Sequence, residues 1–171
     1  MEDSIFEIGA FMDANRAWMK SFAWGGLDVR PKQRLAVLTC MDSRYTAQGI
    51  LGLELGDAHV IRNAGGRVTD DAIRSLVLSA HALGTRGCVL IHHSKCGLYG
   101  NSNDAIYTMV KDATGADASG IDFLPFTDLE GSVREDMRQL SECNLLPEDY
   151  QVLGFTYDVD TGLLVEVKLD S

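Results

Sequence analysis

Three short, strongly apolar runs constrain the fold of this chain more than any other feature of its sequence. They are residues 34–39 (RLAVLT), 58–63 (AHVIRN) and 88–93 (CVLIHH). Each has the length and β-branched content of a strand that is buried on both faces. Between the second and third runs, residues 69–83 have helical spacing, with Thr69 as an N-cap before two aspartates and Gly84 as the stop. This strand–helix–strand order predicts parallel pairing through right-handed crossovers.

The two ends of the chain add helices and a hairpin. Residues 3–20 and 127–140 have amphipathic helical patterns, the second with Thr127 and Glu130 as a capping box. Residues 151–169 form two alternating runs around an Asp-Thr-Gly turn, which predicts a terminal hairpin. The predicted architecture is an α/β fold, a mostly parallel sheet flanked by helices, in which the hairpin adds one antiparallel strand at an edge.

Composition narrows the classes of function. At 171 residues the chain has the size of a single domain, spanning 1–171, and residues 100–126 of it give no pattern that names a ligand. The balance of 25 acidic against 15 basic residues argues against a protein that covers nucleic-acid phosphates or an anionic membrane. Because the sequence has no apolar stretch of about 20 residues and no secretory signal, we expect a cytoplasmic protein whose four cysteines are thiols.

Chemically reactive side chains follow all three predicted strands. The runs lead into CMDSR (40–44), RNAGG (62–66) and HHSKCG (92–97). In such a sheet, ligands collect just beyond the carboxyl ends of the strands, and neighbouring strands lie about 4.8 Å apart. We therefore expect Cys40 and the pair His93 and Cys96 to converge if their strands are neighbours.

Two thiols and one imidazole at that edge fit a zinc site with an open fourth position. The spacing alone also fits a buried Cys40 with His92 and His93 hydrogen-bonded at the strand end, or a thiol enzyme in which His93 activates Cys96. His92 faces away from His93 along the strand and is expected to pack. The remaining cysteines and histidines have no expected chemical role: Cys88, Cys143, His59 and His81.

The order of these motifs resembles the β-class carbonic anhydrases, above all their short members. The family pattern is Cys-x-Asp-x-Arg, then Asn-Ala-Gly, then His-x-x-Cys-Gly, and it stands here as CMDSR, RNAGG and HSKCG. The likeness covers about residues 30–100 and resumes at the terminal hairpin. It implies that Cys40, His93 and Cys96 hold Zn²⁺, with Asp42 as a possible fourth ligand in a closed state.

The resemblance also implies catalytic roles for Asp42 and Arg44. Asp42 would accept the proton of a water at the metal while Arg44 orients it, although a plain ion pair that braces the loop is the simpler alternative. The residues expected to form the pocket are Asn63, Ala64, Gly65, Gly66, Lys95, Gly97 and Leu98. For residues 63–66, an ordinary tight turn is equally compatible with the sequence.

The loop between the last two zinc ligands departs from the family pattern. It reads Ser94-Lys95, where members usually have Thr-Asp. An ammonium group beside the metal would favour anions there.

The motifs indicate a reaction type but leave the substrate open. Attack of metal-bound hydroxide on a small linear molecule describes the hydration of CO₂ to bicarbonate. It also describes the hydrolysis of carbonyl sulfide to H₂S and CO₂, which some short family members perform, as others do with carbon disulfide. A zinc-binding structural protein without catalysis is the remaining alternative.

Family members also pair as dimers, often through the N-terminal helix. Residues 1–26 are therefore predicted to be a helical arm that contacts a second copy, in a homodimer or a higher assembly. Its aromatic residues are more numerous than a lone helix on a small sheet requires: Phe6, Phe11, Trp18, Phe22 and Trp24.

Overall fold

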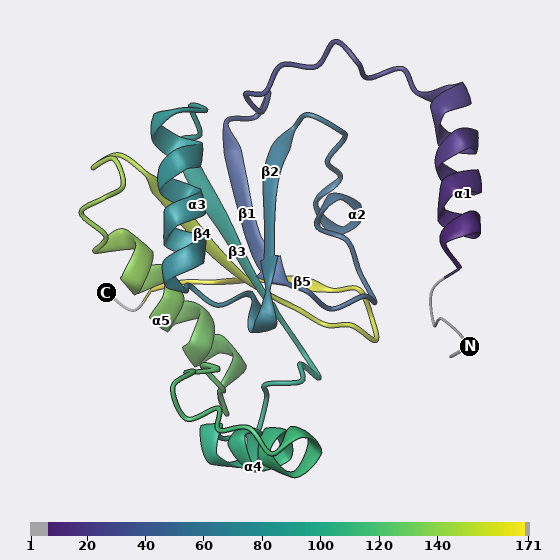
Figure 1. The fold of residues 1–171 in the computed structure, drawn as a ribbon. Coiled ribbons are helices and arrows are strands. Elements are labelled where there is room, and N and C mark those ends of the chain that lie inside the picture. Colours follow the sequence, from purple (N-terminus) through teal and green to yellow (C-terminus); the bar gives the residue numbers. More distant parts are fainter. Residues whose placement is uncertain (1–6, 170–171) are drawn as a thin grey trace.

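The computed structural model of the chain describes residues 7–169. Residues 3–6 of the predicted N-terminal helix, with Phe6, lie outside the described residues. Within this range five strands form one sheet in the order β2-β1-β3-β4-β5 (Figure 1). The strands are β1 (Leu35–Cys40), β2 (Ala58–Asn63), β3 (Gly87–His93), β4 (Gln151–Tyr157) and β5 (Leu164–Val167).

The pairing of the strands confirms the predicted fold class. β1 pairs in parallel with both β2 and β3, and β3 pairs in parallel with β4. β5 folds back antiparallel to β4 and forms one edge of the sheet, as the hairpin prediction required. Because β1 and β3 are neighbours, the residues that follow them come together at one edge.

Helices α1 (Ile8–Ser21), α2 (Ala47–Leu51), α3 (Asp70–His81), α4 (Asn103–Thr114) and α5 (Leu129–Ser141) and a 3₁₀ turn, η1 (Ala64–Gly66), complete the described chain. In α3 the Thr69 side chain caps the helix by accepting from the Ala72 N–H, as predicted. None of the helices in residues 7–169 has the length and apolarity needed to cross a membrane.

The start of α5 differs from the prediction. The capping box of Thr127 and Glu130 is wrong, because the helix begins at Leu129 and Asp128 occupies the N-cap position. Phe126 pairs with Tyr99 in a short parallel bridge, and this contact keeps the backbone extended before the helix. Glu130 instead accepts from Arg134 one turn later, at 2.8 Å.

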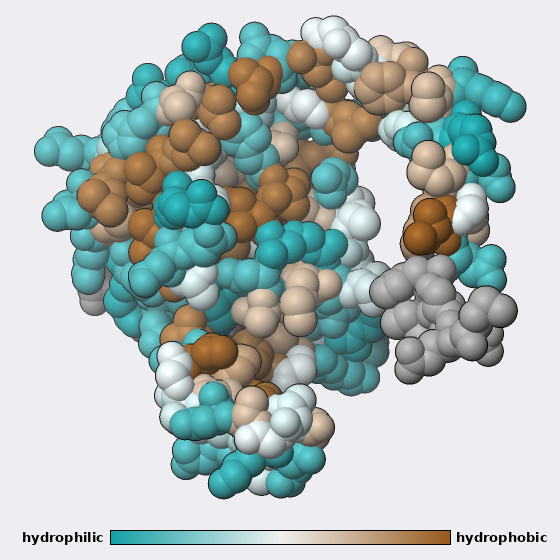
Figure 2. All heavy atoms as spheres, in the orientation of Figure 1, coloured by the Kyte–Doolittle hydropathy of each residue, from teal (hydrophilic) through white to brown (hydrophobic). Residues whose placement is uncertain are grey.

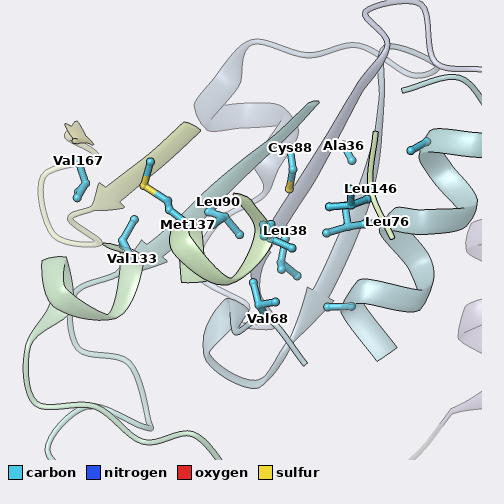
Figure 3. Close-up of a cluster of buried hydrophobic side chains, with 13 residues drawn as sticks. Ala36, Leu38, Val68, Leu76, Cys88, Leu90, Val133, Met137, Leu146 and Val167 are labelled. Atoms are coloured by element: carbon cyan, nitrogen blue, oxygen red, sulfur yellow. The ribbon is translucent and has the colours of Figure 1, made fainter. Parts of the chain in front are cut away.

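Two apolar clusters lie on opposite faces of the sheet. α3 and α5 cover one face, where Leu38 and Leu90 of the strands pack against Leu76 of α3 and Val133 of α5 (Figure 3). The other face carries Val37, Val89 and Ile91 and is covered by the short α2 and neighbouring loops. Cys40 and Cys96 belong to this second cluster, so it forms the floor beneath the reactive strand ends.

α1 stands apart from the rest of the molecule. No residue of α1 is buried by the rest of the described chain, and Figures 1 and 2 show it separated from the sheet, joined to β1 only by the linker after Ser21. Its large apolar side chains are exposed: Ile8, Phe11, Met12, Trp18 and Met19.

Candidate metal centre

Cys40, His93 and Cys96 converge at the carboxyl end of the sheet. Cys40 is the last residue of β1 and His93 the last of β3, and the turn after β3 returns Cys96 to the same place. One potential ligand atom from each side chain lies within 4.8 Å of the other two, and all three residues are buried. A Cys–His–Cys set at this separation suits a tetrahedral zinc ion with one open position.

The ring nitrogens of His93 have different surroundings. Nδ1 lies 2.8 Å from the Ser94 carbonyl oxygen, and this contact requires Nδ1 to carry the proton. Nε2 is buried and has no hydrogen-bond partner among the described residues. The edge of the Tyr45 ring packs on the imidazole, with 5.4 Å between ring centroids, and fixes its plane. A buried nitrogen that has only a free lone pair beside two thiols fits a metal ligand.

The two thiols share one proton. The hydrogen bond with Cys96, together with the backbone N–H groups of Asp42 and Gly65, lowers the pKa of Cys40 to about 4 against the opposing effect of burial. The same sulfur–sulfur hydrogen bond raises the pKa of Cys96. The pair therefore carries negative charge in a buried position, which is the environment that a soft divalent cation would neutralise.

Asp42 and Arg44 form a bidentate ion pair at the rim of this cluster. Arg44 Nε donates to Oδ1 at 2.9 Å and Nη2 donates to Oδ2 at 2.7 Å. The hydrogen bonds from the Arg44 side chain hold the pKa of the Asp42 carboxyl well below its usual range. Asp42 Oδ2 lies 3.8 Å from His93 Nε2, so an ionised oxygen points toward the ligand cluster while the guanidinium fixes its orientation.

The turn at residues 63–66 lies directly against Cys40. Gly66 has φ +72°, and a Cβ there would lie 2.8 Å from the Cys40 backbone nitrogen, so only glycine fits this contact. Met41 N–H donates to the Asn63 carbonyl at 2.8 Å, and Asn63 Nδ2 donates to the Arg67 carbonyl at 2.7 Å. The segment is thus a close wall of the site rather than a surface turn.

An apolar cavity of about 490 Å³ opens beside Cys40 and Cys96. Ala64, Gly65, Gly97 and Leu98 line it, together with Cys40, Asp42 and Cys96. The outer wall is formed by Ile106 and Met109 of α4 and by Phe123. All three lie in residues 100–126, where the sequence had no pattern that named a ligand. Three of the expected pocket residues do not line the cavity: Asn63, Gly66 and Lys95.

Lys95 contacts the site through its backbone. Its carbonyl oxygen accepts from Arg44 Nη2 at 3.0 Å, and its backbone has a left-handed φ of +54°. The ammonium group turns away to Asp160 of the hairpin, at 2.5 Å, in an exposed ion pair. The side chain therefore does not place the positive charge in the cavity that the sequence led us to expect there.

Arg62 and Tyr45 support the ligands, and the sequence did not single them out. Arg62 Nε donates to the Cys40 carbonyl at 2.8 Å and Nη2 donates to the Asp42 carbonyl. The guanidinium also covers the Tyr45 ring, whose hydroxyl lies 2.8 Å from Thr39 Oγ1. The position of Arg62 at the end of β2, directly before the Asn-Ala-Gly segment, was the available signal.

His92 points to the opposite face of β3. Its Nδ1 lies 2.8 Å from Ser132 Oγ and its Nε2 lies 3.2 Å from Asp136 Oδ2. These three side chains have the order of a Ser–His–Asp triad, but all are buried under α5 and Ser132 Oγ donates to the Leu129 carbonyl. No substrate has access to this hydroxyl, so the group packs and links β3 to α5.

Comparison with known proteins agrees with this geometry. A family model described as carbonic anhydrase matches residues 35–164. The β-carbonic anhydrase 1 of Mycobacterium tuberculosis is 38% identical over 145 residues, which cover 84% of this chain and 87% of that protein. A carbon disulfide hydrolase of Acidithiobacillus thiooxidans is 32% identical over 152 residues, covering 77% of this chain and 76% of that protein.

Solved structures give the same result. The crystal structure of a carbonic anhydrase from Streptococcus mutans superposes with a TM-score of 0.92 at 47% sequence identity, covering 97% of this chain and 100% of that one. These relatives indicate an enzyme, a lyase or a hydrolase. From its motifs, its sheet and its relatives, the chain belongs to the β-carbonic anhydrase family.

Proposed function

We propose that this chain is a zinc enzyme that hydrates CO₂ to bicarbonate. The observation that carries the proposal is the convergence of Cys40, His93 and Cys96 within 4.8 Å, beside an apolar cavity that Cys40, Cys96 and the Arg44-paired Asp42 line. Family membership supports the same reaction, because the alignment with the β-carbonic anhydrase 1 of Mycobacterium tuberculosis covers 84% of this chain.

Cys40, His93 and Cys96 would hold the zinc ion. The unpartnered Nε2 of His93 and the adjacent Cys40 and Cys96 thiols, which would lose their protons on binding the metal, fit a Cys–His–Cys zinc site. When bound, Zn²⁺ supplies Lewis acidity that lowers the pKa of water and so provides a nucleophile at neutral pH.

Asp42 is the proton acceptor of this proposal. Its carboxylate stays ionised at neutral pH because Arg44 donates to both oxygens, and Oδ2 is the oxygen nearer the ligand cluster. Arg44 is fixed in turn by the Lys95 carbonyl. The base is thus held in one orientation before the substrate arrives, which meets the geometric requirement of general-base catalysis.

The cavity wall favours a small uncharged substrate. Leu98, Ile106, Met109 and Phe123 offer few hydrogen-bond partners, so a neutral linear molecule binds there without losing strong contacts with water. An anionic product such as bicarbonate finds no compensating charge on the same wall and leaves toward solvent.

The second candidate is the hydrolysis of carbonyl sulfide on the same residues. The apolar wall suits a sulfur-containing substrate at least as well as CO₂, and relatives named carbon disulfide hydrolase are 32% identical to this chain. The residue roles are unchanged. Addition of water to the carbon of carbonyl sulfide is followed by cleavage of the C–S bond, which gives H₂S and CO₂.

Two assays on one zinc-quantified preparation separate these functions. Stopped-flow measurement of CO₂ hydration is compared with carbonyl sulfide consumption and sulfide release. Fast hydration with undetectable sulfide supports the first proposal, and the reverse result supports the second. Absence of both activities from protein that contains stoichiometric zinc would leave a zinc-binding structural role and contradict both.

We also propose that the functional unit is a homodimer or a higher assembly in which residues 1–26 contact a second copy. The apolar side chains of α1 have no partner within the described chain, and β-carbonic anhydrases of Sordaria macrospora that share this fold are described as tetrameric. A cytoplasmic location, expected from the sequence, stays a prediction.

A further inference from the structure

A buried ion pair lies behind the cavity and is not part of the ligand cluster. Arg67 and Asp136 are 3% and 1% exposed. Arg67 Nε and Nη2 donate to the two carboxylate oxygens at 3.0 and 3.1 Å, and the Val68 N–H adds a third hydrogen bond to Asp136 at 3.0 Å. Burial disfavours the charged carboxylate, but the hydrogen bonds from His92 and Arg67 outweigh this effect and lower the pKa of Asp136.

The remaining donors of Arg67 hold the outer wall of the cavity. Nη1 donates to the Leu124 carbonyl at 2.8 Å, directly after the cavity-lining Phe123, and Nη2 also reaches Glu135 at 2.5 Å. The guanidinium lies over the Phe126 ring, 5.9 Å from its centroid. One side chain therefore fixes the segment that carries Phe123. Leu124 in this segment has a left-handed φ of +53°, which a non-glycine residue rarely adopts.

The backbone of Arg67 holds the inner wall. Arg67 follows η1 directly, and its carbonyl accepts from Asn63 Nδ2, which closes the turn. Within that turn, Gly66 lies directly against the Cys40 backbone. On the other side, Val68 is anchored in the core with Val133 of α5 (Figure 3).

We propose that Arg67, fixed by Asp136, is a positioning residue that holds both walls of the cavity, the Gly65–Gly66 turn against Cys40 and the Phe123–Leu124 segment over the opening. A buried ion pair is a poor source of stability in itself, because apolar residues of similar volume often replace it without loss. What apolar replacements do not supply is the directed hydrogen bond to the Leu124 carbonyl and the fixed geometry next to Gly66. The inference rests on the proposed metal site but not on the choice of substrate.

The experiment uses the full-length zinc-loaded protein and the double variant Arg67→Met/Asp136→Leu, which removes both charges together. The matched control is Arg86→Met/Asp149→Leu, an exposed ion pair at the opposite end of β3. Hydrogen exchange is followed in residues 63–66 and 121–126, and zinc affinity is measured by competition with a chelator.

We expect amide exchange in both segments to rise at least about tenfold in the Arg67/Asp136 variant, since the local contacts that protect them are lost. Zinc affinity should fall by about 10- to 100-fold, as is usual when a group that orients a ligand is removed. KM should rise more than kcat falls. The control variant should match the wild type in all three measurements.

Wild-type exchange and zinc affinity in a folded double variant would overturn the proposal and leave Arg67 a packing residue. If the double variant does not fold, Arg67→Lys decides. A lysine keeps the charge opposite Asp136 but has no fork to reach Leu124, so exchange should rise in residues 121–126 and stay low in 63–66. Wild-type protection of both segments in this variant would equally contradict the proposal. Zinc content and turnover of the wild type test the proposed function separately.

Discussion

In the proposed function, Asp42 is the residue on which proton transfer depends most directly. In Asp42→Ala, zinc should remain bound because the three ligand side chains are untouched, whereas kcat/KM for CO₂ should fall by about 10²- to 10⁴-fold, the usual contribution of a positioned base. Stopped-flow kinetics and metal analysis on the same sample check this. Asp71→Ala, which removes an exposed ion pair on α3, is the control and should keep full activity. Full activity in Asp42→Ala would remove Asp42 from the mechanism.

The four cysteines should react with thiol reagents in a fixed order. Burial raises the pKa of Cys88 to about 12, so this thiol stays protonated and unreactive until the pH approaches that value. In zinc-loaded protein at neutral pH, only the half-buried Cys143 should be modified. After removal of the metal by a chelator, Cys40 should react next, because its pKa is lowered and it is a thiolate at neutral pH.

Mass spectrometry of iodoacetamide-treated protein locates the modified residues. Cys96→Ala should lose zinc and activity together. Because it also removes the hydrogen bond that most lowers the pKa of Cys40, Cys40 should react more slowly there than in the chelator-treated wild type. Equal labelling of Cys40 with and without zinc would show that this sulfur does not bind the metal.

The sequence predicted that Cys40, His93 and Cys96 converge, but it did not predict the residues that support them. Cys40 and His93 are the last residues of β1 and β3, and Cys96 lies in the turn after β3. Their convergence was expected if these two strands are neighbours, and the two strands do pair. Arg62 donates to the Cys40 carbonyl, and Arg67 donates to the Asp136 carboxylate, 69 residues further along the chain. Such contacts depend on the length and direction of a long side chain in the folded state, which local pattern does not contain.

At the level of elements, the turn η1 should be the least tolerant of substitution. Gly66→Ala places a Cβ 2.8 Å from the Cys40 nitrogen at φ +72°. Gly84→Ala is a matched control, since Gly84 has φ +78° and a Cβ there meets no described atom within 4 Å. The control should lose about 1 kcal/mol of unfolding free energy for the left-handed backbone, and Gly66→Ala about 3 kcal/mol or more, with loss of activity.

Urea denaturation of both variants measures this difference, and equal losses would show that the turn moves away from Cys40 at little cost.

The strands and the short helices show how far the sequence could predict individual elements. The apolar runs predicted β1, β2 and β3 to within one residue at each end. The sequence predicted neither α2, which has only five residues, nor the bounds of α4 within residues 100–126. α4 is about as amphipathic as α3, but none of its residues is buried within the described chain.

The position of α1 belongs to the whole molecule. A helix over residues 3–20 was predicted and α1 spans Ile8–Ser21, but nothing in the local pattern says what its apolar side covers. The structure leaves that side in contact with solvent, and among the described residues the sheet face opposite α3 and α5 is covered mainly by the short α2 and loops. Both surfaces would be buried if α1 of one copy packs on another copy.

The apolar residues of α1 recur at three- and four-residue intervals, so they form one stripe along the helix. Phe11→Lys places a charge in that stripe, and Ala17→Lys places the same charge on the opposite side as a control. If the stripe is the contact between copies, Phe11→Lys should weaken the dimer by about 2 kcal/mol, roughly 30-fold in Kd, as for the loss of a central apolar anchor. Sedimentation over a concentration series measures Kd for all three proteins.

α1 has no buried contact with the rest of its own described chain, so neither substitution should alter the thermal unfolding of the monomer. A change in Kd therefore reports on the interface alone. An unchanged Kd in Phe11→Lys, or a wild type that stays monomeric at every concentration, would mean that α1 does not join two copies.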